Sequence, residues 1–192
     1  ADLGAEKFID IKCRQTGLEP NVIVIVATIR AMKYHGGKKV EDLNNEDLDA
    51  LEKGFANLER HIENCSQHYG LNLVVGINHF KTDTDAEIKL VQEKVEKLGF
   101  KAILCSHWGE GSKGAELLAK EAISLAEKPN QFKYLYDTKD SIKSKLNTIA
   151  QNIYRAKDVI FEDEALSQLN VIEDEYAHLP VCIAKTPYSF SG

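Results

Sequence analysis

The stretch Val22–Gly37, VIVIVATIRAMKYHGG, decides how the rest of the chain is interpreted. Its first six residues are apolar and almost all β-branched, which is typical of a strand buried on both faces of a sheet. The polar residues that follow are Thr28, Arg30, Lys33, His35 and the pair Gly36-Gly37. Ligands of α/β proteins bind outside the carboxyl ends of parallel strands, so this order favours a strand that opens into a binding crevice. A core strand followed by an ordinary solvated turn is the alternative that the same residues leave open.

The composition limits the class of protein. The chain has 192 residues, enough for one full core, with a formal net charge of −6 and a pI near 5.6. This acidic balance argues against a nucleic-acid binder, which needs a basic face. No apolar run approaches the roughly 18–20 residues of a membrane span, and no signal peptide is visible. The four cysteines, far apart and without a C-x-x-C pair, indicate reduced thiols and a cytoplasmic protein.

Apolar runs and helical periodicity alternate along the first two thirds of the chain. Strands are predicted over residues 22–27, 71–77 and 102–105, and helices over residues 5–13, 48–65, 84–98 and 114–126. The cap of the second helix is predicted at Asn44 or Asn45, and that of the third at Asp83 or Thr84. This alternation predicts an α/β fold with a mostly parallel sheet and flanking helices.

The last third is more helical. Helices are predicted around residues 142–153 and 162–176, an edge strand at 132–136, and a short final strand at 180–184. The helix over residues 114–126 is largely apolar, and we expect it to be well buried. A weak boundary at Asn130-Gln131 separates a sheet-containing segment, residues 1–130, from a helical extension with a final strand, residues 131–192, within one compact unit.

Parallel strands end at the same edge of a sheet, so the residues after each strand should converge. These are Thr28–Arg30, Asn78–Phe80, Ser106–Trp108 and Lys185–Tyr188. Neighbouring strands lie about 4.8 Å apart, so Phe80 and Trp108 are placed to flank a planar ring such as a purine, pterin or benzoyl group. The alternative is that one or both rings fill the top of the core.

Two loops have features of nucleotide sites. Residues 78–83, NHFKTD, resemble the base-reading loop of GTPases, although Asp83 also fits a helix cap. The glycines of residues 109–114 open a helix and suit an anion seat, although a flexible turn has the same composition. The candidate nucleotide-binding residues are Asn78, Thr82, Asp83, Gly109 and Gly111. The phosphate-binding motif G-x-x-x-x-G-K-[ST] is absent from these 192 residues.

Metal and triad chemistry have little support in the spacing. His35, His79, His107 and Cys105 lack the paired spacing of zinc ligands, so no metal site is predicted. A Ser-His-Asp hydrolase is unsupported, because no G-x-S-x-G motif is present.

The whole chain resembles formate–tetrahydrofolate ligase. The resemblance rests on eight blocks in the family's order: ADLGAEKFIDIKCR, VIVIVATIRAMKYHGG, LEKGFANLERHIEN, INHFKTDTDAEI, HWGEGSKGAELLAKEA, FKYLYD, SIKSKLNTIAQNIY and LPVCIAKTPYSFS. The chain departs from the family at three positions: Met32 replaces the usual Leu, Arg155 the usual Gly, and Pro187 a polar residue. Proline stiffens that last loop and removes a backbone donor.

The resemblance implies an ATP-dependent ligation in one-carbon metabolism. Formate attacks the γ-phosphate of ATP to give formyl phosphate, and N10 of tetrahydrofolate then takes the formyl group. ATP with Mg²⁺, formate and tetrahydrofolate are the implied substrates, with a monovalent cation left open. A P-loop NTPase-like fold and a homo-oligomer are also implied, with neither nucleic acid nor membrane as a partner.

The same resemblance implies roles for individual residues. Phe80 and Trp108 match the aromatic pair that stacks on the folate or adenine ring. The other implied substrate-binding residues are Arg30, Lys33 and Lys185, and Asn78 and His35 are added as candidates because they follow the predicted strands. The cations among them suit phosphate groups or the carboxylates of folate.

The family's phosphate loop is expected upstream of Ala1 and its C-terminal domain after Gly192. The chain is therefore expected to be an internal segment that supplies the ring-binding part and has little turnover of its own. Two alternatives stay open: an inactive folate- or nucleotide-binding module, and a structural paralogue.

Overall fold

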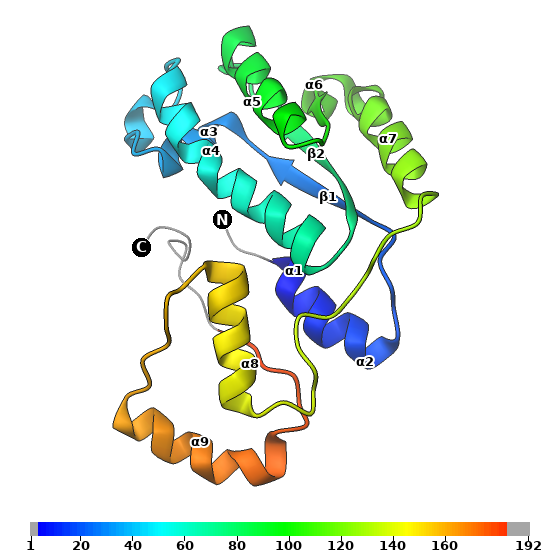
Figure 1. Ribbon diagram of the computed structural model, residues 1–192. Coiled ribbons are helices and arrows are strands. Elements are labelled where there is room, and N and C mark those ends of the chain that lie inside the picture. Colours follow the sequence, from blue (N-terminus) through cyan, green and yellow to red (C-terminus); the bar gives the residue numbers. More distant parts are fainter. Residues whose placement is uncertain (1–3, 184–192) are drawn as a thin grey trace. The chain divides into compact units, whose positions relative to one another are not determined.

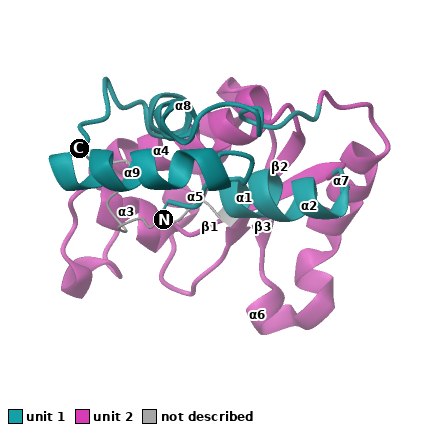
Figure 2. Cartoon of the chain, turned by 90° about the horizontal axis from the view of Figure 1, so that it is seen from below, with its two compact units in different colours: residues 1–19, 132–192 teal, residues 20–131 magenta. Residues whose placement is uncertain are grey.

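The computed structural model describes residues 4–183 (Figure 1). The chain divides into two compact units, one made of residues 1–19 and 132–192 and the other of residues 20–131 (Figure 2). The second unit contains the sheet and most of the residues predicted to form the site.

The sheet of residues 20–131 has three parallel strands in the order β1-β2-β3. They are β1 (Val22–Ala27), β2 (Asn72–Asn78) and β3 (Ala102–Cys105). The helices of this unit are α3 (Ile29–His35), α4 (Leu48–Glu63), α5 (Asp85–Lys97), α6 (His107–Glu110) and α7 (Glu116–Ala126). Short 3₁₀ turns cover Val40–Asp42 and Gly111–Ala115, and a π-helical turn, Asn64–His68, extends α4. The α/β alternation predicted from the sequence is confirmed.

Helices cover both faces of the sheet. Helix α7 packs on the face that contains Gly76, where an added Cβ would stand 3.0 Å from the Leu118 side chain. Helices α4 and α5 pack on each other and contact the outer strands β1 and β3 respectively (Figure 1). The central strand β2 is the most buried of the three, with Leu73, Val74 and Ile77 almost fully enclosed.

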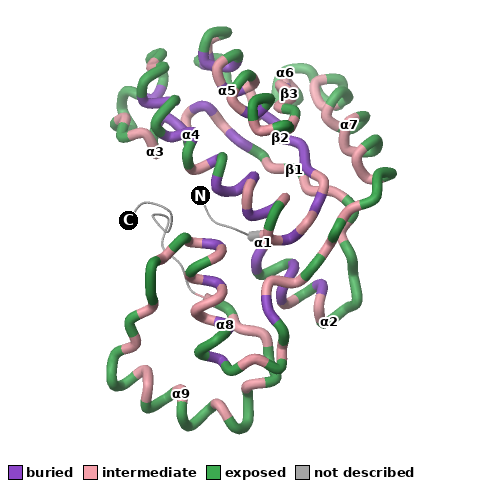
Figure 3. Tube along the Cα trace, viewed as in Figure 1, coloured by how far each residue is buried: buried purple, intermediate pink, exposed green. Residues whose placement is uncertain are grey.

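The first strand and the last helix of this unit are less buried than the sequence predicts. Val24 is 39% exposed and Val26 is 69% exposed, so the prediction that β1 is buried on both faces is wrong. Helix α7 has no buried residue, and Leu117 and Ile123 are more than half exposed (Figure 3). Apolar composition therefore predicts where these elements lie in the sequence. It does not predict how much of their surface is buried within this chain.

Side-chain caps fix where the two longest helices of this unit begin. Asp47 caps α4 by accepting from the Ala50 N–H at 2.9 Å, so the predicted cap at Asn44 or Asn45 is wrong by two or three residues. Thr84 caps α5 by accepting from the Glu87 N–H, and the Glu87 carboxylate accepts from the Thr84 N–H, which completes a capping box. Of the two caps proposed for α5, Thr84 is confirmed.

The other unit is mainly helical. Its first helix is continuous from Gly4 to Thr16, as α1 (Gly4–Lys7), a π-helical segment (Phe8–Cys13) and α2 (Arg14–Thr16), and it ends at Gly17 with φ +70°. Helix α8 (Ile142–Thr148) runs into a π-helical turn, Ile149–Ile153, and α9 (Asp163–Tyr176) follows. These helices confirm the predicted ones.

Neither strand predicted in this unit forms in the described residues. In residues 132–136 the Leu135 N–H donates to Asp10 Oδ1, and Arg14 donates to the Tyr136 carbonyl oxygen and lies over the Tyr134 ring. Side chains of the first helix thus satisfy the backbone groups that a neighbouring strand would pair. Residues 180–183 are also non-strand, and residue 184 of that predicted strand lies outside the described residues.

A buried lysine joins three backbone segments of the same unit. Lys145 is fully buried, and its ammonium donates to the carbonyl oxygens of Thr138 at 2.8 Å, Leu179 at 3.0 Å and Ala177. Burial lowers the pKa of Lys145 from its ordinary value. An ammonium group has three N–H donors, so these three carbonyl oxygens satisfy all of its hydrogen bonds without a carboxylate partner.

Candidate functional site

The three strands of the sheet end at one edge. Ala27 of β1 lies opposite Ile77 of β2, and Asn78 of β2 lies opposite Cys105 of β3. The ladder extends one residue further, because the His79 N–H donates to the Cys105 carbonyl oxygen at 3.1 Å. The loops that begin at residues 28, 79 and 106 therefore emerge side by side, as the sequence predicts. The fourth predicted segment, which contains Lys185, lies outside the described residues.

Two aromatic side chains in these loops are exposed. Phe80 is 40% exposed and Trp108 is 78% exposed, so neither ring fills the core. A cation lies over each ring: the Arg30 guanidinium carbon is 5.7 Å from the Phe80 centroid, and Lys81 Nζ is 5.5 Å from the Trp108 centroid. The Arg30 contact joins the first loop to the second, and the Lys81 contact joins the second to the third.

A buried carboxylate holds the Phe80 loop in a turn. Asp83 Oδ2 accepts from the Phe80 N–H at 2.8 Å, and the Asp83 N–H donates to the Phe80 carbonyl oxygen at 2.9 Å. Asp83 is 9% exposed, and its second oxygen, Oδ1, is buried without a hydrogen-bond partner. Burial raises the pKa of Asp83 above its usual value. Asp83 thus faces inward beneath the loop, whereas Thr82 is exposed.

Lys33, predicted as a ligand-binding cation, lies in the interior. Its Nζ is 2.8 Å from Glu87 Oε1, and both side chains have 0% exposure. It also donates to the Asn45 carbonyl oxygen at 3.0 Å. Burial acts to raise the pKa of Glu87, but the hydrogen bonds from Lys33, Asp47 and Thr84 outweigh it, so the net shift is downward. These hydrogen bonds therefore favour the carboxylate form of Glu87.

The remaining candidates around α3 are partly exposed. Arg30 is half-buried and donates to Asn44 Oδ1 at 2.8 Å. His35 is half-buried near the end of α3, in an edge-to-face contact with Tyr34, and burial lowers the pKa of its imidazole. Asn78 is the last residue of β2 and is also half-buried. These side chains lie at or near the edge where the loops emerge.

The glycine-rich loop is an ordered pair of short helical turns. The N–H groups of Gly109 and Glu110 both donate to the Ser106 carbonyl oxygen at 3.0 Å, and the Ser106 N–H donates to the Gly114 carbonyl oxygen. An added Cβ on Gly114 would stand 2.4 Å from the His107 nitrogen, so this close return requires glycine. Gly111 has φ +61°, which also favours glycine.

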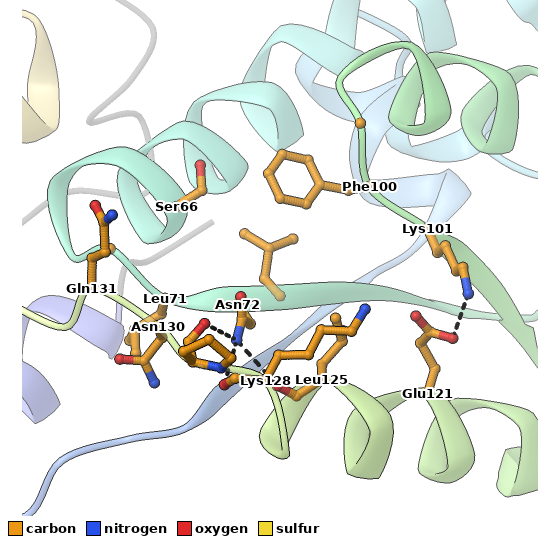
Figure 4. A pocket seen from close by; sticks show the side chains of 14 residues that line it. Ser66, Leu71, Asn72, Phe100, Lys101, Glu121, Leu125, Lys128, Asn130 and Gln131 are labelled. Carbon is orange, nitrogen blue, oxygen red and sulfur yellow. Dashed lines mark hydrogen bonds and ion pairs between the residues drawn. The ribbon is translucent and has the colours of Figure 1, made fainter.

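A pocket of about 550 Å³ lies at the opposite edge of the sheet, near the starts of β2 and β3 (Figure 4). Many of its polar groups are already paired. The Asn72 amide donates to the carbonyl oxygens of Leu125, Lys128 and Pro129, and Lys101 pairs with Glu121 at 2.7 Å. These contacts anchor the end of α7 to the sheet. The predicted crevice and this pocket are therefore two separate places in the same unit.

Residues 4–183 contain neither a cluster of metal ligands nor a membrane-spanning helix. No group of three or more His, Cys, Asp or Glu side chains able to hold a metal ion occurs there. None of the helices in this part is long and apolar enough to cross a membrane.

Several residues that shape this edge were not predicted from the sequence. Glu87, Asn44 and Lys81 each contact a predicted site residue, and Asp47 contacts Glu87. The spacing Thr84-x-x-Glu87 is a capping-box signature that identifies Glu87 from the sequence as a helix-start residue. No comparable sequence motif indicates that Lys33 is the buried partner of Glu87.

Together, the parallel sheet and the loops at its carboxyl edge define an α/β protein with a candidate ring-binding site. The sequence model of the family described as "Formate--tetrahydrofolate ligase" matches residues 1–192, and the chain belongs to this family.

Curated relatives with that name match the whole chain. The ligase of Methylococcus capsulatus is 52% identical over 192 residues, that of Methylorubrum populi 54% over 194, and that of Methylibium petroleiphilum 50% over 196. The matched region is 34–35% of the length of these relatives, so the chain spans about one third of each.

Proposed function

We propose that the chain is an internal segment of a formate–tetrahydrofolate ligase and supplies its ring-binding surface. Identity of about half over the whole chain supports the activity of the longer protein, in which ATP, formate and tetrahydrofolate give 10-formyltetrahydrofolate, ADP and phosphate. The phosphate-binding motif G-x-x-x-x-G-K-[ST] is absent from these 192 residues, so we assign the P-loop contacts of the ATP phosphates to the rest of the longer protein. A P-loop NTPase-like sheet of which these three strands are part, a homo-oligomer and a cytoplasmic location belong to the same proposal.

The observation that carries this proposal is the pair of exposed rings. Phe80 and Trp108 follow the neighbouring strands β2 and β3 at the same edge, and both present apolar area to solvent. Stacking of a base or pterin on an aromatic side chain contributes about 1–3 kcal/mol. A planar heterocycle placed against these rings would cover them.

Charged and polar residues around the rings support an anionic ligand. Arg30 and Lys81 each lie within about 6 Å of a ring centroid, where they suit the carboxylates of folate or the phosphates of a nucleotide. His35, Asn78 and Lys185 are proposed as further contacts, with Thr82, Gly109 and Gly111 on the nucleotide side. For Lys33 and Asp83, whose polar groups face inward, we propose indirect roles through the loops that they hold.

A second candidate function is ligand binding without turnover, as a folate- or nucleotide-binding module. The exposed rings fit it equally well, and the absence of the motif G-x-x-x-x-G-K-[ST] from these residues favours it for this chain in isolation. A purely structural paralogue would bind neither ligand.

Trp108 is the only tryptophan, so its fluorescence reports directly on the site. We expect saturable quenching when tetrahydrofolate or ADP is titrated into the 192-residue chain, and about 5- to 100-fold weaker binding after Phe80→Ala. Phe100→Ala is the matched control, because Phe100 lines the pocket at the other edge of the sheet. An unquenched wild-type chain would contradict both binding functions.

A further inference from the structure

A buried charge network lies beneath the candidate site. The Glu87 carboxylate pairs with Lys33 at 2.8 Å, and both side chains are completely enclosed. Glu87 Oε1 also accepts from the Asp47 N–H at 3.0 Å, and Oε2 accepts from the Thr84 N–H at 3.1 Å. One carboxylate therefore joins three segments: helix α3, the segment before α4 and the segment before α5.

Each of the two segments before a helix is bonded to a residue of the site. Asn44, next to the Asn45 carbonyl that accepts from Lys33, accepts through Oδ1 from Arg30 at 2.8 Å. Asp83, next to the Thr84 N–H that donates to Glu87, accepts from the Phe80 N–H at 2.8 Å. Arg30 and Phe80, whose guanidinium carbon and ring centroid lie 5.7 Å apart, are thus both linked through these segments to the buried Lys33–Glu87 pair.

We propose that Glu87 and Lys33 are positioning residues that hold Arg30 and Phe80 at the spacing a planar anionic ligand requires. The inference rests on the proposed ring-binding function and deepens it. Neither residue touches the ligand; each acts through the backbone segment that it fixes.

The energetics of buried ion pairs favour this role over a purely stabilising one. Removing two charges from water costs roughly as much as their attraction returns, so a buried pair is often replaceable by uncharged side chains of similar volume. We expect this pair to contribute by holding α3 and the segments before α4 and α5 in one arrangement. Its effect should therefore appear in ligand affinity even in a variant that remains folded.

The test variant is Lys33→Met/Glu87→Gln, which removes both charges but keeps an acceptor near the Asp47 and Thr84 N–H groups. The control is Val95→Ala. Val95 is fully buried in the same helix, α5, so its truncation leaves a cavity and destabilises the unit without changing Lys33 or Glu87. Tetrahydrofolate affinity is measured through Trp108 fluorescence at a temperature where circular dichroism shows each variant folded.

We expect the double variant to bind tetrahydrofolate about tenfold more weakly than wild type, and Val95→Ala to bind within twofold of wild type. Equal affinity in all three proteins, or equal weakening in the two variants, overturns the inference but leaves ring binding intact. Loss of binding in the wild type overturns both. Asn44→Ala, at an exposed position where folding is not at risk, keeps the inference testable if the double variant does not fold. It should weaken binding about threefold, and unchanged affinity would contradict the inference.

Discussion

The carbonyl oxygen of Met32 lies where the side chain of residue 54 would begin. A Cβ built on Gly54 would stand 1.7 Å from that oxygen and 2.8 Å from the Gly36 nitrogen. Helices α3, which carries Arg30, and α4 are therefore in direct backbone contact through a glycine. This close approach fixes the distance between the end of β1 and the helix that covers it.

Gly54→Ala should destabilise the sheet-containing unit by about 3 kcal/mol or more, because the clash is with backbone and only movement of a helix can relieve it. Chemical denaturation followed by circular dichroism measures the change. Lys53→Ala, at the neighbouring exposed position, should stay within about 0.5 kcal/mol of wild type. Similar values for the two variants would show that the helices do not meet this closely.

Arg155 has a backbone conformation that favours glycine. It has φ +53°, in the left-handed region that glycine enters freely, and glycine is the residue the family resemblance leads us to expect there. Arg155→Gly should stabilise the chain by about 0.5–1 kcal/mol, since relief of the strain slightly exceeds the entropy cost of glycine. Arg155→Ala, which keeps a Cβ, should give no gain. A gain of equal size from alanine would assign the effect to the lost side chain.

Asp83 should give a measurable pH signature. Burial raises its pKa in the folded chain, so the folded state binds the proton more tightly than the unfolded state does. The stability that this group contributes therefore falls as pH rises from the unfolded pKa through the folded pKa. Asp83→Asn should be more stable than wild type at pH 7 by roughly 1 kcal/mol, because the amide oxygen can still accept from the Phe80 N–H but no charge is placed in the interior.

That advantage should shrink as the pH is lowered and Asp83 takes up its proton. Urea denaturation at several pH values measures the difference between the two proteins. A difference that grows on acidification would mean that the folded pKa of Asp83 is lowered.

Lys145→Met should destabilise the helical unit by roughly 3 kcal/mol, because it leaves the carbonyls of Thr138, Ala177 and Leu179 without their shared donor. Lys139→Met makes the same chemical change at an exposed position nearby and should be close to neutral. Thermal unfolding compares the two, and equal melting temperatures would contradict the buried position of Lys145.

The periodic elements were predictable because their signal is local. The runs that form β1, β2 and β3 and the three-four spacing in α4 and α5 each lie within one segment, and all five elements form where predicted. The cap of α4 was not predictable to the residue, because Asn44, Asn45 and Asp47 are all good caps within four positions. Only the contacts of Asp47 with Ala50, Lys38 and Glu87 distinguish them.

Non-local partners account for the predictions that failed. The alternation in residues 132–136 reads as a strand, but Arg14 lies between the rings of Tyr134 and Tyr136, 4.1 and 5.1 Å from their centroids. Lys33 reads as a free cation after a strand, but its partner Glu87 is 54 positions away in the sequence. Neither partner can be chosen from spacing, because each is brought near by the fold.

Backbone amide chemical shifts test the central claim most directly, because they compare the two edges of the sheet in one experiment. Tetrahydrofolate titrated into the isotopically labelled 192-residue chain should perturb residues 28–30, 78–83 and 106–111, and leave residues 71–73, 99–101 and 128–131 of the pocket unchanged. If only the pocket residues shift, or if no residues shift at either edge, the ring-binding site is not at the carboxyl ends of the strands.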